Sequence, residues 1–169
     1  MRALPTATGT TPGLRALTVT MPALPAQPEP NFAFSFSYGD CGGTLDTFEQ
    51  TYSTLIKDGE PITIPVTLTD EQMMTIYQKM VAIDFFSYAE TFRIAYDVNG
   101  VVGIQTPAPD YRIKVRNGEL THSVFWRDEI FEPTNREADQ LRELIQIIMQ
   151  VIETNPDIQN LPELNFGCA

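Results

Sequence analysis

Residues 111–126 read YRIKVRNGELTHSVFW and form the clearest structural pattern in the chain. Apolar and polar side chains alternate on both sides of Asn117-Gly118, and an Asn-Gly pair between alternating runs is the strongest short-range signal for a β-hairpin. A two-residue loop at this pair predicts that Ile113 lies opposite His122. The hairpin then has one apolar face and one polar face, which is typical of an antiparallel sheet with one covered side.

Three more strands are predicted before this hairpin. Residues 31–38 alternate strictly, and four aromatic side chains share one face: Phe32, Phe34, Phe36 and Tyr38. Residues 45–54 are rich in Thr, Phe and Tyr, so we expect a second strand that pairs with the first. Residues 62–68 alternate again, and the nearby Pro61 and Pro65 place this third strand at a sheet edge, because proline has no N–H to donate.

A second Asn-Gly pair, Asn99-Gly100, predicts another hairpin in which residues 92–98 pair with residues 101–106. This hairpin and the strands described above bring the expected total to about seven strands, most of them antiparallel.

Two helices are predicted from capping signals and helical periodicity. Thr69 and Gln72 form a capping box, and the residues that follow carry an apolar stripe at helical spacing. A second capping box, Thr134 to Glu137, opens a helix over 135–154 that Asn155-Pro156 ends. We expect the tail from residue 158 to be extended. The sequence therefore predicts an α+β fold, a mostly antiparallel sheet of about seven strands built from hairpins with two helices packed on it.

The first thirty residues differ in composition from the rest. Residues 1–30 hold six of the thirteen prolines and carry a net charge of +1, from Arg2, Arg15 and Glu29. Such a segment cannot sustain a helix or strand, so we interpret residues 1–30 as a disordered leader or linker rich in Pro, Thr and Ala. Residues 31–169 are predicted to form a single globular domain. No stretch approaches the roughly 18 apolar residues of a membrane span.

The net charge of −11 constrains the partners. An acidic protein repels phosphate backbones, so we expect no nucleic-acid partner. The sequence contains no P-loop and no dinucleotide fingerprint, and we expect no cofactor or metal. The expected partner is a protein or a small ligand, and the chain is expected to be a monomer.

Candidate catalytic groups are few. The chain has one histidine, His122, on the predicted apolar face of its hairpin, and we interpret it as a core or rim residue. Cys41 lies in a glycine-rich turn (SYGDCGGT) and could act as a nucleophile if His122 lay beside it. Cys41 could equally form a disulfide with Cys168, as an even cysteine count favours in an exported protein. The carboxylates of Asp40 and Asp46 flank the same turn, and those of Asp128, Glu129 and Glu132 are expected to form a solvated acidic rim. We assign no catalytic residue.

One local positive patch stands out on this acidic chain. Arg112, Lys114 and Arg116 occupy alternate positions on the polar face of the predicted hairpin. Cross-strand pairing on a solvated sheet face explains them, and a face that binds an anionic partner is the alternative.

Several motifs from residue 32 onward resemble a family of small, lipoprotein-like bacterial proteins with no assigned activity. The resemblance covers about four-fifths of the chain. Its motifs are a strand ending in Tyr38-Gly39, the run Leu45-Asp46-Thr47-Phe48, a helix beginning Leu-Thr-x-x-Gln and ending near Asp84-Phe85-Phe86, the Tyr-x-Ile-Lys-Val strand, Trp126-Arg127-Asp128, a long C-terminal helix and Leu161-Pro162. The resemblance implies a cell-envelope location and no site residues. The chain departs from the family because no cysteine precedes Cys41 to form a lipid-attachment box.

These observations favour a non-enzymatic, extracytoplasmic domain that binds a protein or a small ligand. Two alternatives stay open. One is an enzyme of an unrecognised type that uses Cys41 or the carboxylates near it, and the other is a structural or inhibitor-like module that docks a partner. Free cysteines would instead favour a cytoplasmic location.

Overall fold

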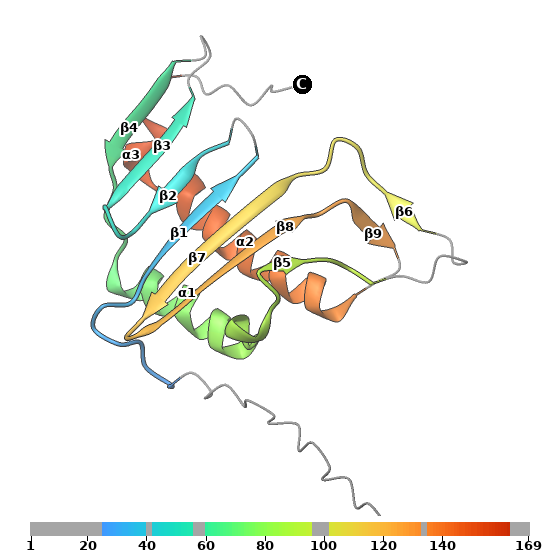
Figure 1. The fold of residues 1–169 in the computed structure, drawn as a ribbon. Coiled ribbons are helices and arrows are strands. Elements are labelled where there is room, and N and C mark those ends of the chain that lie inside the picture. The colour runs from blue at the N-terminus through green and yellow to red at the C-terminus, as the bar shows by residue number, and fades with distance from the viewer. Residues whose placement is uncertain (1–24, 40–41, 56–59, 96–101, 133–134, 163–169) are drawn as a thin grey trace, which may run out of the picture.

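The structure is a computed structural model and describes residues 25–39, 42–55, 60–95, 102–132 and 135–162. Its main feature is a seven-stranded sheet in the order β4-β3-β2-β1-β7-β8-β5, beside a two-stranded ribbon of β6 and β9 (Figure 1). The strands are β1 Ala33–Tyr38, β2 Thr44–Asp46, β3 Thr51–Leu55, β4 Pro61–Pro65, β5 Thr91–Phe92, β6 Gly103–Ile104, β7 Asp110–Asn117, β8 Leu120–Arg127 and β9 Ile130–Glu132. The helices are α1 Asp70–Ala82, α2 Arg136–Thr154, the short α3 Pro156–Gln159 and the 3₁₀ turn η1 Phe85–Ser87. The predicted α+β class is confirmed.

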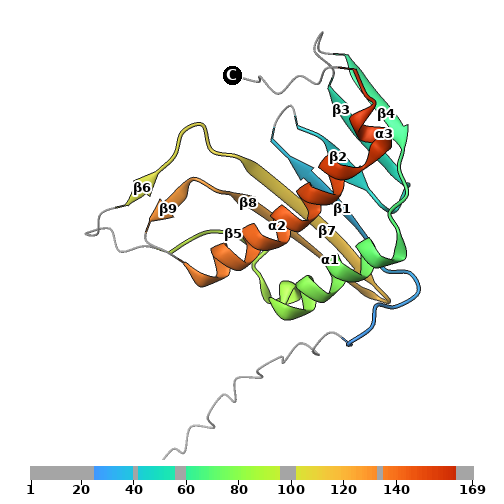
Figure 2. The ribbon, with the colours of Figure 1, turned by 180° about the vertical axis from the view of Figure 1, so that it is seen from behind.

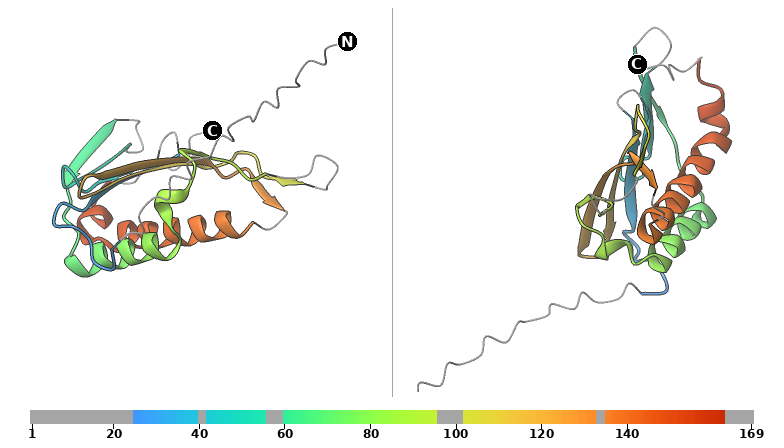
Figure 3. Two further views of the ribbon diagram at one scale, coloured as in Figure 1. Left: turned by 60° about the horizontal axis from the view of Figure 1, so that its bottom comes forward. Right: turned by 90° about the vertical axis from the view of Figure 1, so that its right-hand side faces the viewer.

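Both long helices pack on the same face of the sheet. Figure 2 shows α2 running diagonally across that face with α1 beside it, and the two views of Figure 3 show the helices as one layer and the sheet as the other. The described residues place no helix on the opposite face, which we call the open face. A two-layer arrangement of this kind needs only one apolar side on the sheet.

Alternation along the strands decides which side chains enter the core. The inward positions of the central strands are almost completely buried, and so are the predicted stripes of both helices. The core includes Phe34, Phe36, Leu45, Tyr52, Ile113, Val115, Val124 and Trp126 from the sheet, and Ile76, Tyr77, Met80, Ala138, Leu141, Leu144, Ile145, Ile148 and Ile152 from the helices.

The helix starts follow the capping rules, with one correction. Thr69 accepts from the backbone of Gln72, and the Gln72 side chain accepts from the Thr69 backbone, so the first capping box is confirmed. At α2 the cap is Asn135, whose side chain accepts from the backbone N of Ala138 at 3.0 Å. The prediction that Thr134 caps this helix was therefore one residue early.

The central hairpin forms with a shifted loop. Asn117 pairs with Leu120, so the two-residue loop is Gly118-Glu119, and Ile113 lies opposite Val124 rather than His122. Gly118 stands first in the loop with φ of +62°, where a type II′ turn favours glycine. The shift changes the pairing by two residues. Because side chains alternate with period two, each side chain still lies on the face of the hairpin that was predicted for it.

Two other predictions of local structure were wrong, and a third differs in its described parts. The run 45–54 divides into β2 and β3, because a turn intervenes in which Gln50 takes a left-handed φ of 54°. The turn of the hairpin predicted around Asn99-Gly100 lies outside the described residues, as do all of residues 96–101. On either side of them, β5 lies parallel to β8 and β6 pairs antiparallel with β9. The chain after Asn155 forms α3, so Ile158 lies in a helix and not in an extended tail. The edge position of β4 is confirmed.

Residues 25–32 contact the closed end of the central hairpin. The Tyr77 hydroxyl donates to the carbonyl of Pro25 at 2.7 Å, and the backbone N of Glu29 donates to the buried Oδ1 of Asn117 at 2.8 Å. Asn31 bonds the backbone of Gly118 in both directions. The part of the predicted leader that the structure describes is thus held against the domain, while residues 1–24 lie outside the described residues.

Candidate functional site

The candidate site is the row of basic side chains on the open face. Arg112, Lys114 and Arg116 stand at alternate positions of β7, near the middle of the sheet, and all three are exposed. Their neighbours Ile113 and Val115 point the other way and are buried under the helices. The alternation that builds the core therefore also brings the three cations together on the uncovered side. We call Arg112, Lys114 and Arg116 the basic row.

Aromatic rings hold the long side chains of the basic row. The guanidinium of Arg112 lies 5.5 Å from the ring centroid of Phe125, and that of Arg116 lies 5.0 Å from the centroid of Phe48. The Lys114 ammonium lies 5.8 Å from the same Phe48 ring. These are cation–π distances, and they limit the freedom of side chains that would otherwise move freely on a surface.

The turn that carries Phe48 is itself fixed by Asp46. The Oδ1 atom of Asp46 accepts from the backbone N of Phe48 at 2.8 Å and from that of Glu49 at 3.2 Å. This explains the role of Asp46, one of the carboxylates near the glycine-rich turn: it closes a local turn, as aspartate side chains commonly do. Through Phe48 this turn forms one wall beside Lys114 and Arg116.

Hydroxyl groups stand next to each cation in the register of the sheet. Ser37 of β1 is the neighbour of Arg112, and Ser35 is the neighbour of Lys114. On the other side, β8 places Ser123 beside Lys114 and Thr121 beside Arg116. Hydroxyl and guanidinium donors together suit an anionic oxygen ligand.

None of the cations in the basic row has an ion-pair partner among the described residues. The ion pairs found there join Lys79 with Glu143, Arg127 with Asp110 and Glu129, and Arg142 with Asp128 and Asp139. On a chain of net charge −11, these three neighbouring cations make no ion pair among the described residues, although the carboxylates of Asp46 and Glu49 line the same hollow as Lys114 and Arg116.

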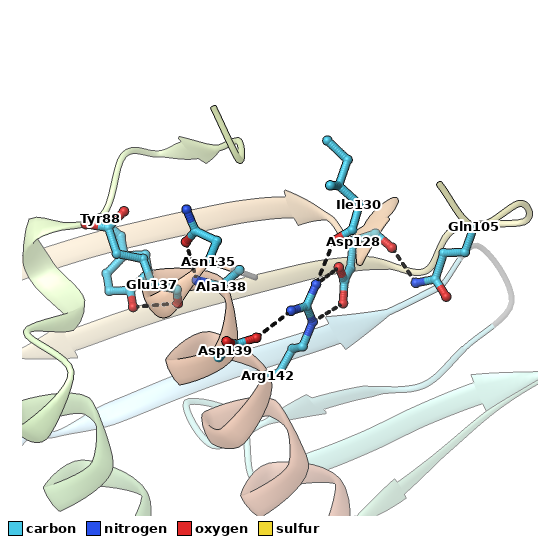
Figure 4. Close-up of polar contacts among 9 residues, drawn as sticks. All are labelled: Tyr88, Gln105, Asp128, Ile130, Asn135, Glu137, Ala138, Asp139 and Arg142. Carbon is cyan, nitrogen blue, oxygen red and sulfur yellow. Dashed lines mark hydrogen bonds and ion pairs between the residues drawn. The ribbon is translucent and has the colours of Figure 1, made fainter. Parts of the chain in front are cut away.

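A second polar cluster, shown in Figure 4, is partly buried between the end of β8 and α2. Arg142 of α2 donates from Nε to Oδ2 of Asp128 at 2.9 Å, and from its Nη2 atom to Oδ1 at 2.6 Å. The same guanidinium reaches the carbonyl of Ile130 at 2.9 Å and Oδ1 of Asp139 at 2.8 Å, and it lies over the Trp126 ring. The bond to Asp128 is the main cause that raises the pKa of Arg142.

This cluster corrects the expected acidic rim. Asp128 is only 6% exposed and forms a two-pronged ion pair, whereas Glu129 is exposed as expected. Gln105 donates to the Asp128 carbonyl at 2.6 Å, which fastens the segment before β7 to the same point. The bonds from Arg142 to Asp128 and Ile130 join the end of β8 to α2, and Gln105 adds the segment before β7, so we interpret the cluster as structural.

The positions of Asp128 and Arg142 in the sequence indicate that the two residues form an ion pair. Asp128 continues the inward series of Val124 and Trp126, and Arg142 stands four residues after the buried Ala138. A charged residue at an inward position on each of two elements indicates a buried ion pair, because an unpaired charge is too costly to bury.

His122 occupies a partly buried place under η1. Its ring stacks on Phe86 at 5.7 Å and meets Phe85 edge-on at 5.8 Å. Its Nε2 atom lies 2.9 Å from the carbonyl oxygen of Tyr88. A carbonyl can only accept, so this bond requires the proton on Nε2. The interpretation of His122 as a core or rim residue agrees with these contacts.

The remaining predicted residues fall outside the described residues. Cys41, Cys168 and Asp40 lie there, so the proposed disulfide and the proposed thiol nucleophile stay predictions. Within the described parts of the chain, no three His, Cys, Asp or Glu side chains are grouped as a metal site would require. No helix in those parts is long and apolar enough to cross a membrane.

Comparison with known proteins adds no family to this description: no protein-family model, no curated protein and no solved structure matches the chain.

Proposed function

We propose that the chain is a non-enzymatic binding domain that receives an anionic partner on the open face of its sheet. The observation that carries the proposal is the basic row: three exposed cations at the centre of the open face, with no ion-pair partner among the described residues of an acidic protein. Cations left without carboxylate partners favour binding of an external anion over stabilisation of the fold.

Electrostatic complementarity would govern specificity and the rate of encounter more than affinity. The row is short, and the charge of −11 on the whole chain opposes long polyanions, which favours a protein partner over nucleic acid. We propose a monomeric domain, in which the open face is free for the partner.

A matched pair of double variants tests the proposed function. Arg112→Gln with Arg116→Gln removes two cations from the row, whereas Arg93→Gln with Arg136→Gln removes the same charge from exposed positions elsewhere. The probe is a fluorescein-labelled decamer of glutamate, followed by anisotropy at physiological salt. Two exposed contacts of about 0.5–1 kcal/mol each predict a loss of about 5- to 30-fold for the first variant.

The control variant should lose much less affinity than the first. Equal losses in both variants would show a response to net charge and would overturn the proposal, as would a wild-type chain that does not bind the probe. Circular dichroism and thermal unfolding of each variant show whether the fold is intact.

We also propose that the domain acts in the cell envelope, outside the cytoplasm. The support is the proline-rich composition of residues 1–30, the even cysteine count and the resemblance to lipoprotein-like proteins. The test is the intact mass of unreduced protein after alkylation in denaturant. An unalkylated chain two hydrogens lighter than the reduced form means that Cys41 and Cys168 are joined, which agrees with export. Two alkylated thiols would count against the envelope location.

A further inference from the structure

We infer that the partner binds as an extended peptide segment with acidic side chains at three alternate positions, lying along β7. This inference rests on the proposed function and adds to it the kind of partner and the spacing of its charges. It follows from the register of the open face, from the groups that limit the basic row, and from the sequence of the chain itself.

The spacing of the basic row is the first step. Arg112, Lys114 and Arg116 are separated by two residues of an antiparallel strand, which is a repeat of about 6.8 Å. An extended peptide repeats its side chains on one face at the same distance. In a peptide with an acidic side chain at every second position, each acidic side chain therefore lies opposite one cation of the row. If the acidic side chains are three residues apart, only one of them can lie opposite a cation at a time.

Each cation is accompanied by a hydroxyl, which makes three similar subsites. Arg112 has Ser37 beside it, Lys114 has Ser35 and Ser123, and Arg116 has Thr121. A carboxylate accepts from both kinds of donor, and a guanidinium can bind it with two parallel bonds. Two hollows on the open face border the row, one lined by Lys114 and Arg116 together with Asp46 and Glu49, the other by Arg112 together with Asp110, so the row is accessible along its length.

The row is limited to three subsites by a carboxylate. The next outward position of β7 is Asp110, two residues before Arg112. Asp110 would repel a fourth acidic group in the same register, and its contact with Arg127 is loose, with Nε of Arg127 3.9 Å from its Oδ1. A uniform polyanion such as single-stranded nucleic acid carries charge past this point, so a short acidic stretch within a peptide fits better.

The chain cannot supply this partner from its own sequence. Its 22 acidic residues include no three at alternate positions i, i+2 and i+4. No segment of residues 1–169, in the same chain or in a second copy, therefore has the required pattern, which favours a segment from elsewhere.

Two heptapeptides of equal composition test the spacing: TDTDTDT, with aspartate at every second position, and DTTDTTD, with aspartate at every third. The full chain is titrated with each labelled peptide at physiological salt. The alternating peptide can make two more contacts in register, so it should bind about 5- to 30-fold more tightly. The Lys114→Gln variant, which removes the middle subsite, should lose most of this preference, and the Arg93→Gln variant should keep it.

The outcomes separate this inference from the proposed function. Equal affinity for both peptides, lost in the Arg112→Gln, Arg116→Gln variant, overturns the spacing and leaves the binding function standing. Binding of neither peptide, together with no binding of the glutamate decamer, overturns both. A labelled oligothymidylate that binds more tightly than TDTDTDT in a row-dependent way overturns the peptide assignment. A peptide with four alternating aspartates should gain less than threefold, and a larger gain would contradict the limit set by Asp110.

Discussion

At the scale of single residues, the contact between Asp128 and Arg142 has a direct consequence for the stability of the fold. A buried carboxylate is tolerated only when a partner compensates it. Here both carboxylate oxygens receive hydrogen bonds from one guanidinium, which also satisfies the carbonyl of Ile130. Removing the arginine leaves the aspartate buried without compensation, whereas changing both residues to apolar ones need not be harmful.

We predict that Arg142→Ala lowers the free energy of unfolding by about 3 kcal/mol, because it leaves the Asp128 carboxylate unpaired. Arg142→Lys should be intermediate, since an ammonium cannot make the parallel bonds of a guanidinium. Urea unfolding followed by tryptophan fluorescence measures both. Asp139→Asn is the control, because its side chain is 43% exposed and the variant should lose less than 1 kcal/mol. A stable Arg142→Ala protein would contradict the structural role.

Buried tyrosines make the stability of the fold decrease at alkaline pH. Burial, with a smaller effect of the nearby Glu137, raises the pKa of Tyr88 to about 12 from 10.0, and its hydroxyl donates to the Glu137 carbonyl at 2.9 Å. A raised folded pKa contributes stability that is complete below pH 10 and is lost as the pH rises toward 12. Burial and the bond with Tyr52 raise the pKa of Tyr38 in the same direction.

We predict that the stability difference between wild type and Tyr88→Phe shrinks as the pH rises from 10 to about 12. The variant lacks the ionisable group, so it does not lose that part of the stability. Urea unfolding at a series of alkaline pH values measures the difference, and tyrosinate absorbance reports the ionisation. A difference that stays constant across this range would show that Tyr88 does not titrate with a raised pKa.

At the scale of elements, local sequence signals predicted the parts of the fold that local contacts build. The hairpin of β7 and β8 depends on neighbouring residues and on alternation, and its two faces were predicted correctly although its loop was misplaced by one residue. The capping box at Thr69 likewise depends on residues three apart. The basic row was visible for the same reason, because its residues lie on one strand.

Elements held by distant contacts could not be predicted in this way. β5 has only two residues and pairs in parallel with β8, more than thirty residues later, so no turn signal marks it. The break between β2 and β3 depends on Gln50 adopting a left-handed backbone, which is uncommon for glutamine and has no sequence mark. The walls of the site, Phe48 and Phe125, were missed because they come from different strands and turns.

The loop of the central hairpin gives a prediction at this scale. Gly118 has φ of +62°, and a Cβ added there would lie 3.1 Å from Cγ of Glu29. Gly118→Ala should therefore lose about 1–2 kcal/mol of unfolding free energy. Gly118→Asn should lose less, because asparagine enters the left-handed region more readily. Chemical unfolding of both variants measures the effect, and an alanine variant as stable as wild type would contradict the observed loop.

At the scale of the whole molecule, charge has two effects: the excess of carboxylates destabilises the fold, and the basic row attracts anions. The chain carries 22 acidic and 11 basic residues, so the compact state repels itself. The three cations of the basic row are concentrated on the open face, where they attract an anion locally. Salt screens both interactions, since the Debye length falls from about 30 Å at 0.01 M to about 8 Å at 0.15 M.

We therefore predict opposite salt dependences for folding and for binding. Between about 0.01 M and 0.15 M sodium chloride the free energy of unfolding should rise, because screening relieves the repulsion among the excess carboxylates. Over the same range the affinity for TDTDTDT should fall, because screening weakens attraction to the basic row. Urea unfolding and anisotropy titrations on one protein preparation measure both. A fall in stability with salt would mean that attractive pairs outweigh the net repulsion. An affinity that does not change with salt would mean that the row does not hold the peptide by charge.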